Sequence, residues 1–148
     1  MNSRVVPYLA GHLEQIFEGQ LNHEAGESTL AFGAHADKLE VDGLSHSYIV
    51  NGFVIAVGGV APLWAGVGEG WVIASEKIYS HGIGVARSTR RLLETMAEAE
   101  KLHRIQSAVL TSDERLPRFA KFLGFQREGE MRNYGVDKKN YDLYSRIL

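Results

Sequence analysis

Hydrophobic residues in the first part of the chain have the spacing of one helix face. Between residues 8 and 21 they fall three or four positions apart, which predicts an amphipathic helix over Tyr8–Leu21. The positions that carry this pattern are Leu9, Leu13, Ile16, Phe17 and Leu21. From Asn22 to Asp42 the pattern weakens, and glycines and charged residues predict only short helical turns or a loop.

Two short apolar runs follow, Tyr48–Val50 and Phe53–Val57, separated by Asn51-Gly52. Asn-Gly favours the positive φ angles of a tight two-residue turn, so the pattern predicts a β-hairpin. Both arms are apolar on both faces, which indicates a sheet covered on both sides. The whole uncharged stretch from residue 44 to 68 is interrupted by Gly-Gly and Ala-Pro pairs and has no flanking Lys or Arg. It therefore favours buried strands over a membrane span.

The second half of the chain alternates strand and helix patterns. We expect a strand, a long helix, another strand, a short helix capped by Ser112 or Asp113 and ended by Leu123-Gly124, and two final strands. The strands are expected at Glu69–Ala74, Ile105–Thr111, Gln126–Tyr134 and Tyr141–Leu148, and the long helix at Ile83–Leu102. The order helix, three strands, helix, strand, helix, two strands predicts a mixed α/β fold.

Length and composition narrow the class of protein. The 148 residues predict a single domain over 1–148, and 45% hydrophobic with 23% charged residues is ordinary for a globular chain. The net charge of −2 gives no electrostatic case for binding nucleic acid. No cysteine is present, and the six histidines lack metal-ligand spacing, so we expect no disulfide, no cysteine nucleophile and no metal site. The first residues lack the pattern of a signal peptide, and we expect a cytoplasmic protein that does not bind membranes.

Glycine is in excess, with 16 residues, and eight of them lie between Gly52 and Gly84. Gly82-Ile83-Gly84 opens the long predicted helix, where backbone N–H groups point outward at the positive end of the helix dipole. Such a turn can bind a phosphate, or it can simply reverse the chain. It is not a dinucleotide fingerprint, because Arg87 stands where the third glycine would be, and no P-loop or Gly-x-Ser-x-Gly motif is present.

These features together resemble the GCN5-related N-acetyltransferases (GNAT) over about residues 45–148. The resemblance lies in the strand ending at Ala74, the Gly82-Ile83-Gly84 turn, the following helix and strand, and Phe119–Phe125 with its Leu-Gly-Phe ending. The closing segment, Gly129–Gly135 and Tyr141–Tyr144, is similar to small GNAT-like proteins of tailed bacteriophages and prophages. The resemblance implies a central mixed, mostly antiparallel sheet of about six to seven strands flanked by helices.

The resemblance also implies a chemistry and its residues. Acetyl-CoA would be the co-substrate, with its thioester beside the backbone of Ile73 and Ala74, where an N–H would stabilise the oxyanion. Backbone N–H groups at the start of the helix would hold the pyrophosphate, and Arg87 or Arg90 would reach a phosphate. The N–H donors implied are those of Gly82, Ile83, Gly84 and Val85. The acceptor would be a primary amine on a small molecule or a protein, attacking directly in a ternary complex.

Four positions depart from the family pattern. Tyr79 stands where the family usually has Gln or Arg, Asp113 where Asn is common, and Ala120 where a tyrosine often protonates the leaving thiolate. The usual glutamate base falls near Gly68, one position from Glu69. We therefore predict Glu69 as the base and Tyr134 as the acid, each with the alternative of an ordinary strand or packing residue.

Two other functions stay open from the sequence. One is a catalytically silent GNAT-fold protein that serves in phage structure, assembly or host interaction, in the bacterial host cytoplasm if phage-encoded. The other is a protein that binds acyl-CoA as a regulatory ligand. The apolar region from Tyr48 to Trp64 would also suit a homodimer, or burial within one sheet.

Overall fold

The computed structural model describes residues 2–19, 41 and 43–148. The expectation of short turns or a loop over residues 22–42 lies outside the described residues, apart from Val41. The elements in chain order are β1 (Ser3–Pro7), α1 (Ala10–Gly19), β2 (Ser45–Val50), β3 (Phe53–Trp64), β4 (Val67–Ala74), η2 (Glu76–Ser80), α3 (Gly82–Ala99), β5 (Arg104–Leu110), α4 (Arg115–Phe122), β6 (Gln126–Met131) and β7 (Tyr141–Ile147). η2 is a single stretch of 3₁₀ helix.

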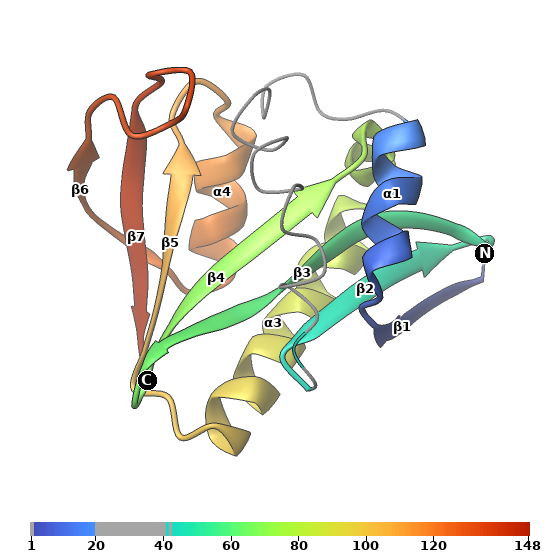
Figure 1. The fold of residues 1–148 in the computed structure, drawn as a ribbon, viewed down its shortest axis with the longest axis horizontal. Coiled ribbons are helices and arrows are strands. Elements are labelled where there is room, and N and C mark those ends of the chain that lie inside the picture. The colour runs from blue at the N-terminus through green and yellow to red at the C-terminus, as the bar shows by residue number, and fades with distance from the viewer. Residues whose placement is uncertain (1, 20–40, 42) are drawn as a thin grey trace.

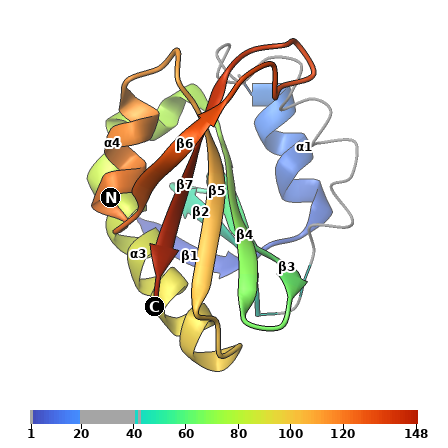
Figure 2. The same ribbon diagram turned by 90° about the vertical axis from the view of Figure 1, so that its left-hand side faces the viewer.

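The strands form one sheet in the order β1-β2-β3-β4-β5-β7-β6 (Figure 1). Only β4 and β5 pair in parallel, and the other five neighbouring pairs are antiparallel. The prediction of a mixed, mostly antiparallel sheet of six to seven strands is therefore confirmed. Figure 2 shows the sheet between α1 on one face and α3 with α4 on the other.

Each face of the sheet has its own hydrophobic core. On the α1 face, Leu13 and Ile16 of α1 are fully buried and pack with Trp71 and Ile73 of β4. On the other face, α3 and α4 cover a cluster that includes Ile105 of β5. The helix pattern of residues 9–16 is thus only partly confirmed, because Leu9 precedes α1 and is 55% exposed.

The predicted hairpin is present, and its turn has the expected geometry. Asn51 and Gly52 have φ angles of 49° and 83°, as a type I′ turn requires. The predicted end of α4 is also present. Gly124, just after this helix, has a φ of 91°, and the N–H of Phe125 donates to the carbonyl of Ala120 at 3.0 Å. This is a Schellman C-cap, as Leu123-Gly124 predicted.

Four strands differ from the prediction by three residues or more, and one of them, β2, begins at Ser45 and not at Tyr48. The sequence pattern gave no sign of β1, a short and largely exposed edge strand. β3 continues through two glycines and Pro62 to Trp64. Its pairing with β2 ends at Gly59, so the strand can include Pro62, which has no N–H to donate, at a position where β2 needs no hydrogen bond from it. β6 ends at Met131 instead of residue 134.

Gly59 marks a point where two backbones come too close for any side chain. A Cβ at this position would lie 2.1 Å from the carbonyl oxygen of Leu44. At Gly129 in β6, a Cβ would meet nothing within 4 Å. A methyl group added at Gly59 should therefore destabilise the protein more than one added at Gly129.

We expect Gly59→Ala to lower the free energy of unfolding by about 1–3 kcal/mol or more, because backbone must move to admit the methyl group. Gly129→Ala is the matched control and should change it by less than about 1 kcal/mol. Urea denaturation followed by tryptophan fluorescence measures both. Equal stabilities for the two variants would show that the contact between Gly59 and Leu44 is not tight.

Candidate functional site

The sheet opens between β4 and β5. Their parallel pairing covers only Val67–Glu69 against Arg104–Gln106, although both strands continue beyond it. The hydroxyl of Ser107 donates to the carbonyl of Gly70 at 2.9 Å, just beyond the last pair. Past this bond the strands diverge, and an opening forms between their carboxyl ends.

The edge of β4 along this opening carries backbone polar groups. Ser75 donates its N–H toward β3, while the Gly70 carbonyl faces β5. Backbone groups alternate in direction along a strand, so the N–H groups of Val72 and Ala74 face the opening as Gly70 does. That of Ile73 faces β3, and its side chain is buried in the α1-face core. Of the two residues predicted to lie beside the thioester, Ala74 is thus the one with an N–H on the open edge.

A cavity of about 240 Å³ leads from this opening toward the helices. Gly70 and Val72 of β4 and Ser107 of β5 line it on the sheet side, and Val85 of α3 and Phe119 of α4 line it on the helix side. Most of its wall is apolar, with backbone groups along the strands. A narrow, extended organic molecule with amide groups would suit such a wall.

The first turn of α3 adjoins the opening. Among the described residues, the N–H groups of Gly82, Ile83 and Gly84 have no hydrogen-bond partner, as expected for a helix start without a side-chain cap. Val85 differs from the prediction, because its N–H donates to the carbonyl of His81 at 3.0 Å. Three N–H groups, not four, are therefore available to an anion here.

The two glycines of this turn serve different needs. A Cβ on Gly84 would lie 2.6 Å from the hydroxyl oxygen of Tyr48, so the end of that side chain would have to move to admit a methyl group. A Cβ on Gly82 would meet nothing within 4 Å, and Ile83 is 71% exposed. Arg87 is exposed on the same helix, whereas Arg90 pairs with Glu94 at 3.7 Å.

Glu69 lies on the other side of β4. Side chains alternate along a strand, so Glu69 shares the α1 face with Trp71 and Ile73, opposite the face of Gly70 and Val72. The Gln106 amide donates to its carboxylate at 3.3 Å. Burial raises the pKa of the Glu69 carboxyl, and the hydrogen bond from Gln106 opposes this rise. A half-buried carboxylate with a raised pKa is a suitable proton acceptor.

Tyr134 lies in the loop after β6, within electrostatic range of Glu69. Burial raises the pKa of the Tyr134 hydroxyl, and the negative charge of Glu69 and the nearby Tyr141 raise it further. Its ring meets that of Tyr141 edge to face, with 5.3 Å between centroids. The structure thus places Tyr134 close enough to Glu69 for the carboxylate charge to act on the tyrosine hydroxyl.

Two of the departures from the family pattern form one cluster. Both Asp113 oxygens accept hydrogen bonds from the Arg115 guanidinium at 2.9 Å, and one also accepts from the Arg115 N–H. The same guanidinium stacks on Tyr79, 3.7 Å from the ring centroid. This contact joins the segment after β4 to the start of α4 after β5. Arg115 therefore neutralises the charge of Asp113.

Ala120, the third departure, is buried and lines the cavity. Its methyl group has no proton to give a leaving group. In the part of the chain that the structure describes, no three His, Asp or Glu side chains are arranged to hold a metal ion. None of the helices over these same residues is long and apolar enough to cross a membrane.

Comparison with known proteins gives the fold of the chain. No family model and no curated protein matches the sequence. Among solved structures, Ard1 from Thermoplasma volcanium matches with a TM-score of 0.77 and 18% identity, over 100% of this chain and 99% of that one. The GNAT superfamily phosphinothricin acetyltransferase from Sinorhizobium meliloti, in complex with AcCoA, matches with 0.70 and 15%, over 100% and 89%. The chain has the GNAT acetyltransferase fold.

A further structure with this fold is yncA, described as a putative acetyltransferase, from Salmonella typhimurium with its cofactor acetyl-CoA. It has a TM-score of 0.71 and 14% identity, over 100% of this chain and 95% of that one. Two GNAT-fold neighbours have therefore been solved with acetyl-CoA bound. At these identities the likeness concerns the fold, and no residue role follows from it.

Sequence reasoning missed three residues of the opening. Ser107 makes the last link between β4 and β5, Gln106 holds Glu69, and Arg115 neutralises Asp113. The register of β4 against β5 decides the first two, and a single sequence does not contain it. For Arg115, its place two residues after Asp113 was the only signal in the sequence that the two side chains would pair.

The Asp113 cluster makes stability depend on pH. Hydrogen bonds from Arg115 lower the Asp113 pKa, so its contribution is complete above the unfolded value of about 3.9 and is lost as pH falls through the folded value. We expect Asp113→Asn to cost about 1 kcal/mol of unfolding free energy at pH 7, since the partner is half exposed. Urea denaturation at pH 7 and pH 3 should show this difference shrinking at the lower pH. A difference that stays the same at both would contradict it.

Proposed function

We propose that the protein is an acetyl-CoA-dependent N-acetyltransferase that transfers the acetyl group to a primary amine. The observation that carries the proposal is the opening between β4 and β5. The N–H groups of Val72 and Ala74 point into this opening from the edge of β4. The Glu69 carboxylate lies on the α1 face of the same strand. A thioester in this opening and an amine beside Glu69 would meet without a covalent enzyme intermediate.

The residues of the α3 face fit coenzyme A as a co-substrate. The N–H groups of Gly82, Ile83 and Gly84 suit its pyrophosphate, and the open approach to Gly82 leaves room for it. The apolar cavity with strand backbone along it suits the pantetheine arm. Arg87 is exposed, and an ion pair between its guanidinium and a phosphate would be weakened by solvent. We therefore expect Arg87 to contribute little to the free energy of coenzyme A binding.

The chemical step would use Glu69 and Tyr134. Glu69 accepts a proton from the incoming ammonium group, directly or through water, and the free amine nitrogen attacks the thioester carbonyl carbon. An outward N–H of β4 stabilises the charge on the carbonyl oxygen. The C–N bond forms, the C–S bond breaks, and Tyr134 donates its proton to the leaving thiolate. The nitrogen then releases its second proton, through water, to the Tyr134 phenolate, which leaves a neutral amide, a thiol and a protonated Glu69. A tyrosine hydroxyl with its ordinary pKa of about 10 is already protonated at neutral pH, and burial raises the pKa of Tyr134 further, so the proton is present to be donated.

One observation favours the second candidate, a GNAT-fold protein without catalysis, such as a phage structural or host-interaction protein. Ala120 is buried at the position where the family's tyrosine acid would stand, and Tyr79 is stacked against Arg115. A protein that had lost the reaction would tolerate both. Cofactor binding and turnover separate the two candidates.

Coenzyme A binding is tested by a charge at the start of α3. Ile83→Asp suits the helix N-terminus and should keep the fold, but its carboxylate would repel the pyrophosphate. We expect the Kd for acetyl-CoA to rise at least 10-fold by titration calorimetry. Leu9→Asp is the matched control, because Leu9 is also exposed and apolar just before a helix. No heat from the wild type with high micromolar acetyl-CoA would refute the proposed function.

Catalysis is tested by Glu69→Gln with a panel of primary amines and a thiol-release assay. We expect kcat to fall by about 10²–10⁴-fold, with the Kd for acetyl-CoA unchanged. Wild-type kcat/KM should fall with decreasing pH through a pKa above the ordinary value of 4.5, because Glu69 must be ionised to accept a proton. The control is Glu130→Gln, an exposed carboxylate of β6. Equal turnover in both variants would remove Glu69 from the mechanism.

A further inference from the structure

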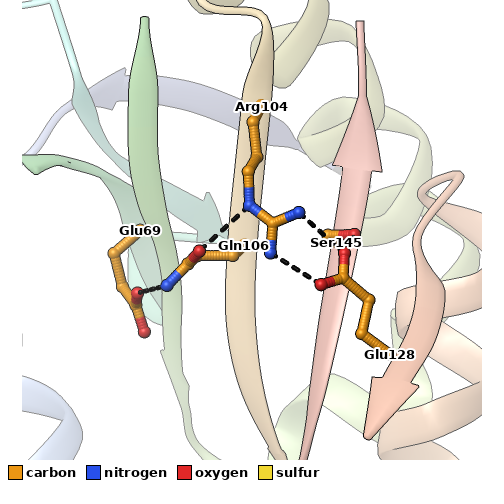
Figure 3. A network of polar contacts seen from close by, with 5 residues as sticks. All are labelled: Glu69, Arg104, Gln106, Glu128 and Ser145. Carbon is orange, nitrogen blue, oxygen red and sulfur yellow. Dashed lines mark hydrogen bonds and ion pairs between the residues drawn. The ribbon is translucent and has the colours of Figure 1, made fainter. Parts of the chain in front are cut away.

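A chain of polar contacts crosses four strands and ends at Glu69 (Figure 3). The Arg104 Nε donates to the Gln106 Oε1 at 3.1 Å, and the Gln106 Nε2 donates to Glu69 at 3.3 Å. The Arg104 guanidinium also makes two hydrogen bonds to Glu128, at 2.7 and 2.9 Å. Glu128 accepts a further, short hydrogen bond from the hydroxyl of Ser145. From β6 to β4, each group in this chain fixes the next.

Arg104 decides which way the Gln106 amide points. A guanidinium has only donors, so the side of the amide that faces Arg104 must be its oxygen. The NH₂ group then faces Glu69 and can only donate to it. The contact with Arg104 therefore turns Gln106 into a fixed donor for the Glu69 carboxylate.

The Arg104 side chain is itself anchored. Glu128 is the extra residue of a β-bulge between Arg127 and Gly129, with no Cα partner on β7. A bulge redirects side chains locally, and here it adds a carboxylate beside Arg104 on this face. Hydrogen bonds from Arg104 and Ser145 lower the pKa of Glu128 to about 2, so the anchor keeps its charge at every pH relevant to catalysis.

We propose that Gln106 is a positioning residue that holds the Glu69 carboxylate toward the opening of the sheet and sets its proton affinity, with Arg104 and Glu128 fixing Gln106. The part that concerns catalysis rests on the proposed function, whereas the effect on Glu69 itself does not. Burial favours the neutral acid, and the Gln106 donor favours the carboxylate. Among the residues that the structure describes, the other titratable groups near Glu69 are Tyr134 and, through Gln106, Arg104; both stay unchanged in a Gln106 variant.

The first test titrates Glu69 itself by carbon-13 NMR of the full-length protein, with Glu69→Gln to assign its carboxyl resonance. Gln106→Leu removes the donor at similar size, and we expect the Glu69 pKa to rise by about half to one unit. Arg104→Met should raise it less, because the amide stays but is no longer fixed. An unchanged Glu69 pKa in Gln106→Leu would overturn the proposal.

The matched control is Arg127→Met. Arg127 makes a similar two-bond contact with Asp142, at 2.7 and 3.1 Å, on β6 and β7. It has no contact with Gln106 among the described residues, so the Glu69 pKa should not change. A shift as large as that of Arg104→Met would attribute the effect to the loss of any arginine contact and overturn the proposal. If Gln106→Leu does not fold, Gln106→Glu keeps the size and places a like charge beside Glu69, which should raise its pKa further.

The second test is the pH dependence of kcat/KM. In Gln106→Leu the acid limb should move to higher pH by the same half to one unit, with the Kd for acetyl-CoA unchanged. An acid limb that stays in place while the NMR pKa moves would overturn the catalytic part of the proposal. A wild type without turnover would refute the proposed function, while the NMR titration would still decide whether Gln106 sets the proton affinity of Glu69.

Discussion

The brevity of the pairing between β4 and β5 is the constraint on which the rest of the site depends. Three residue pairs and two side-chain hydrogen bonds, Ser107 to Gly70 and Gln106 to Glu69, link these strands. Buried backbone groups need partners, so an open strand edge inside a sheet must bond water or a ligand. The opening thus costs the fold a run of ladder hydrogen bonds and provides a row of donors to an extended ligand.

The opening also joins the two faces of the sheet. On one face, the free N–H groups at the start of α3 and the apolar cavity lie together. On the other face lies Glu69, whose negative charge raises the pKa of the Tyr134 hydroxyl. A ligand that binds along the opening can therefore be reached from both faces, which is what a two-substrate transfer needs. The polar chain through Gln106 and Arg104 extends the second face to the far edge of the sheet.

Sequence patterns predicted the features that are local in the chain. The Asn51-Gly52 turn, the Gly124 C-cap and the helix after Gly82 each depend on a few neighbouring residues, and all are present. Two kinds of feature were missed. The edge strand β1 is short and exposed, so it has no apolar pattern, and β3 passes through glycines that usually end a strand.

The candidate site was only partly predictable for the same reason. Glu69 could be chosen through the family resemblance, one position from the usual glutamate base, but its contact with Gln106 depends on how β4 and β5 align. The role of Gly84 was interpreted through a ligand, whereas the hydroxyl of Tyr48, 36 positions earlier, lies where a side chain at position 84 would begin and would have to move to admit one. Such contacts between distant segments follow from packing, and one sequence does not reveal them.

The short pairing between β4 and β5 has a mechanical consequence. It divides the sheet into a half with β1 to β4 and a half with β5 to β7, and α3 packs against residues of both, such as Val60 and Ile105. α3 therefore holds together two halves of the sheet that share few backbone hydrogen bonds. A molecule held between the strands and the first turn of α3 would bridge the halves as well, so binding would stiffen the whole domain and raise its melting temperature.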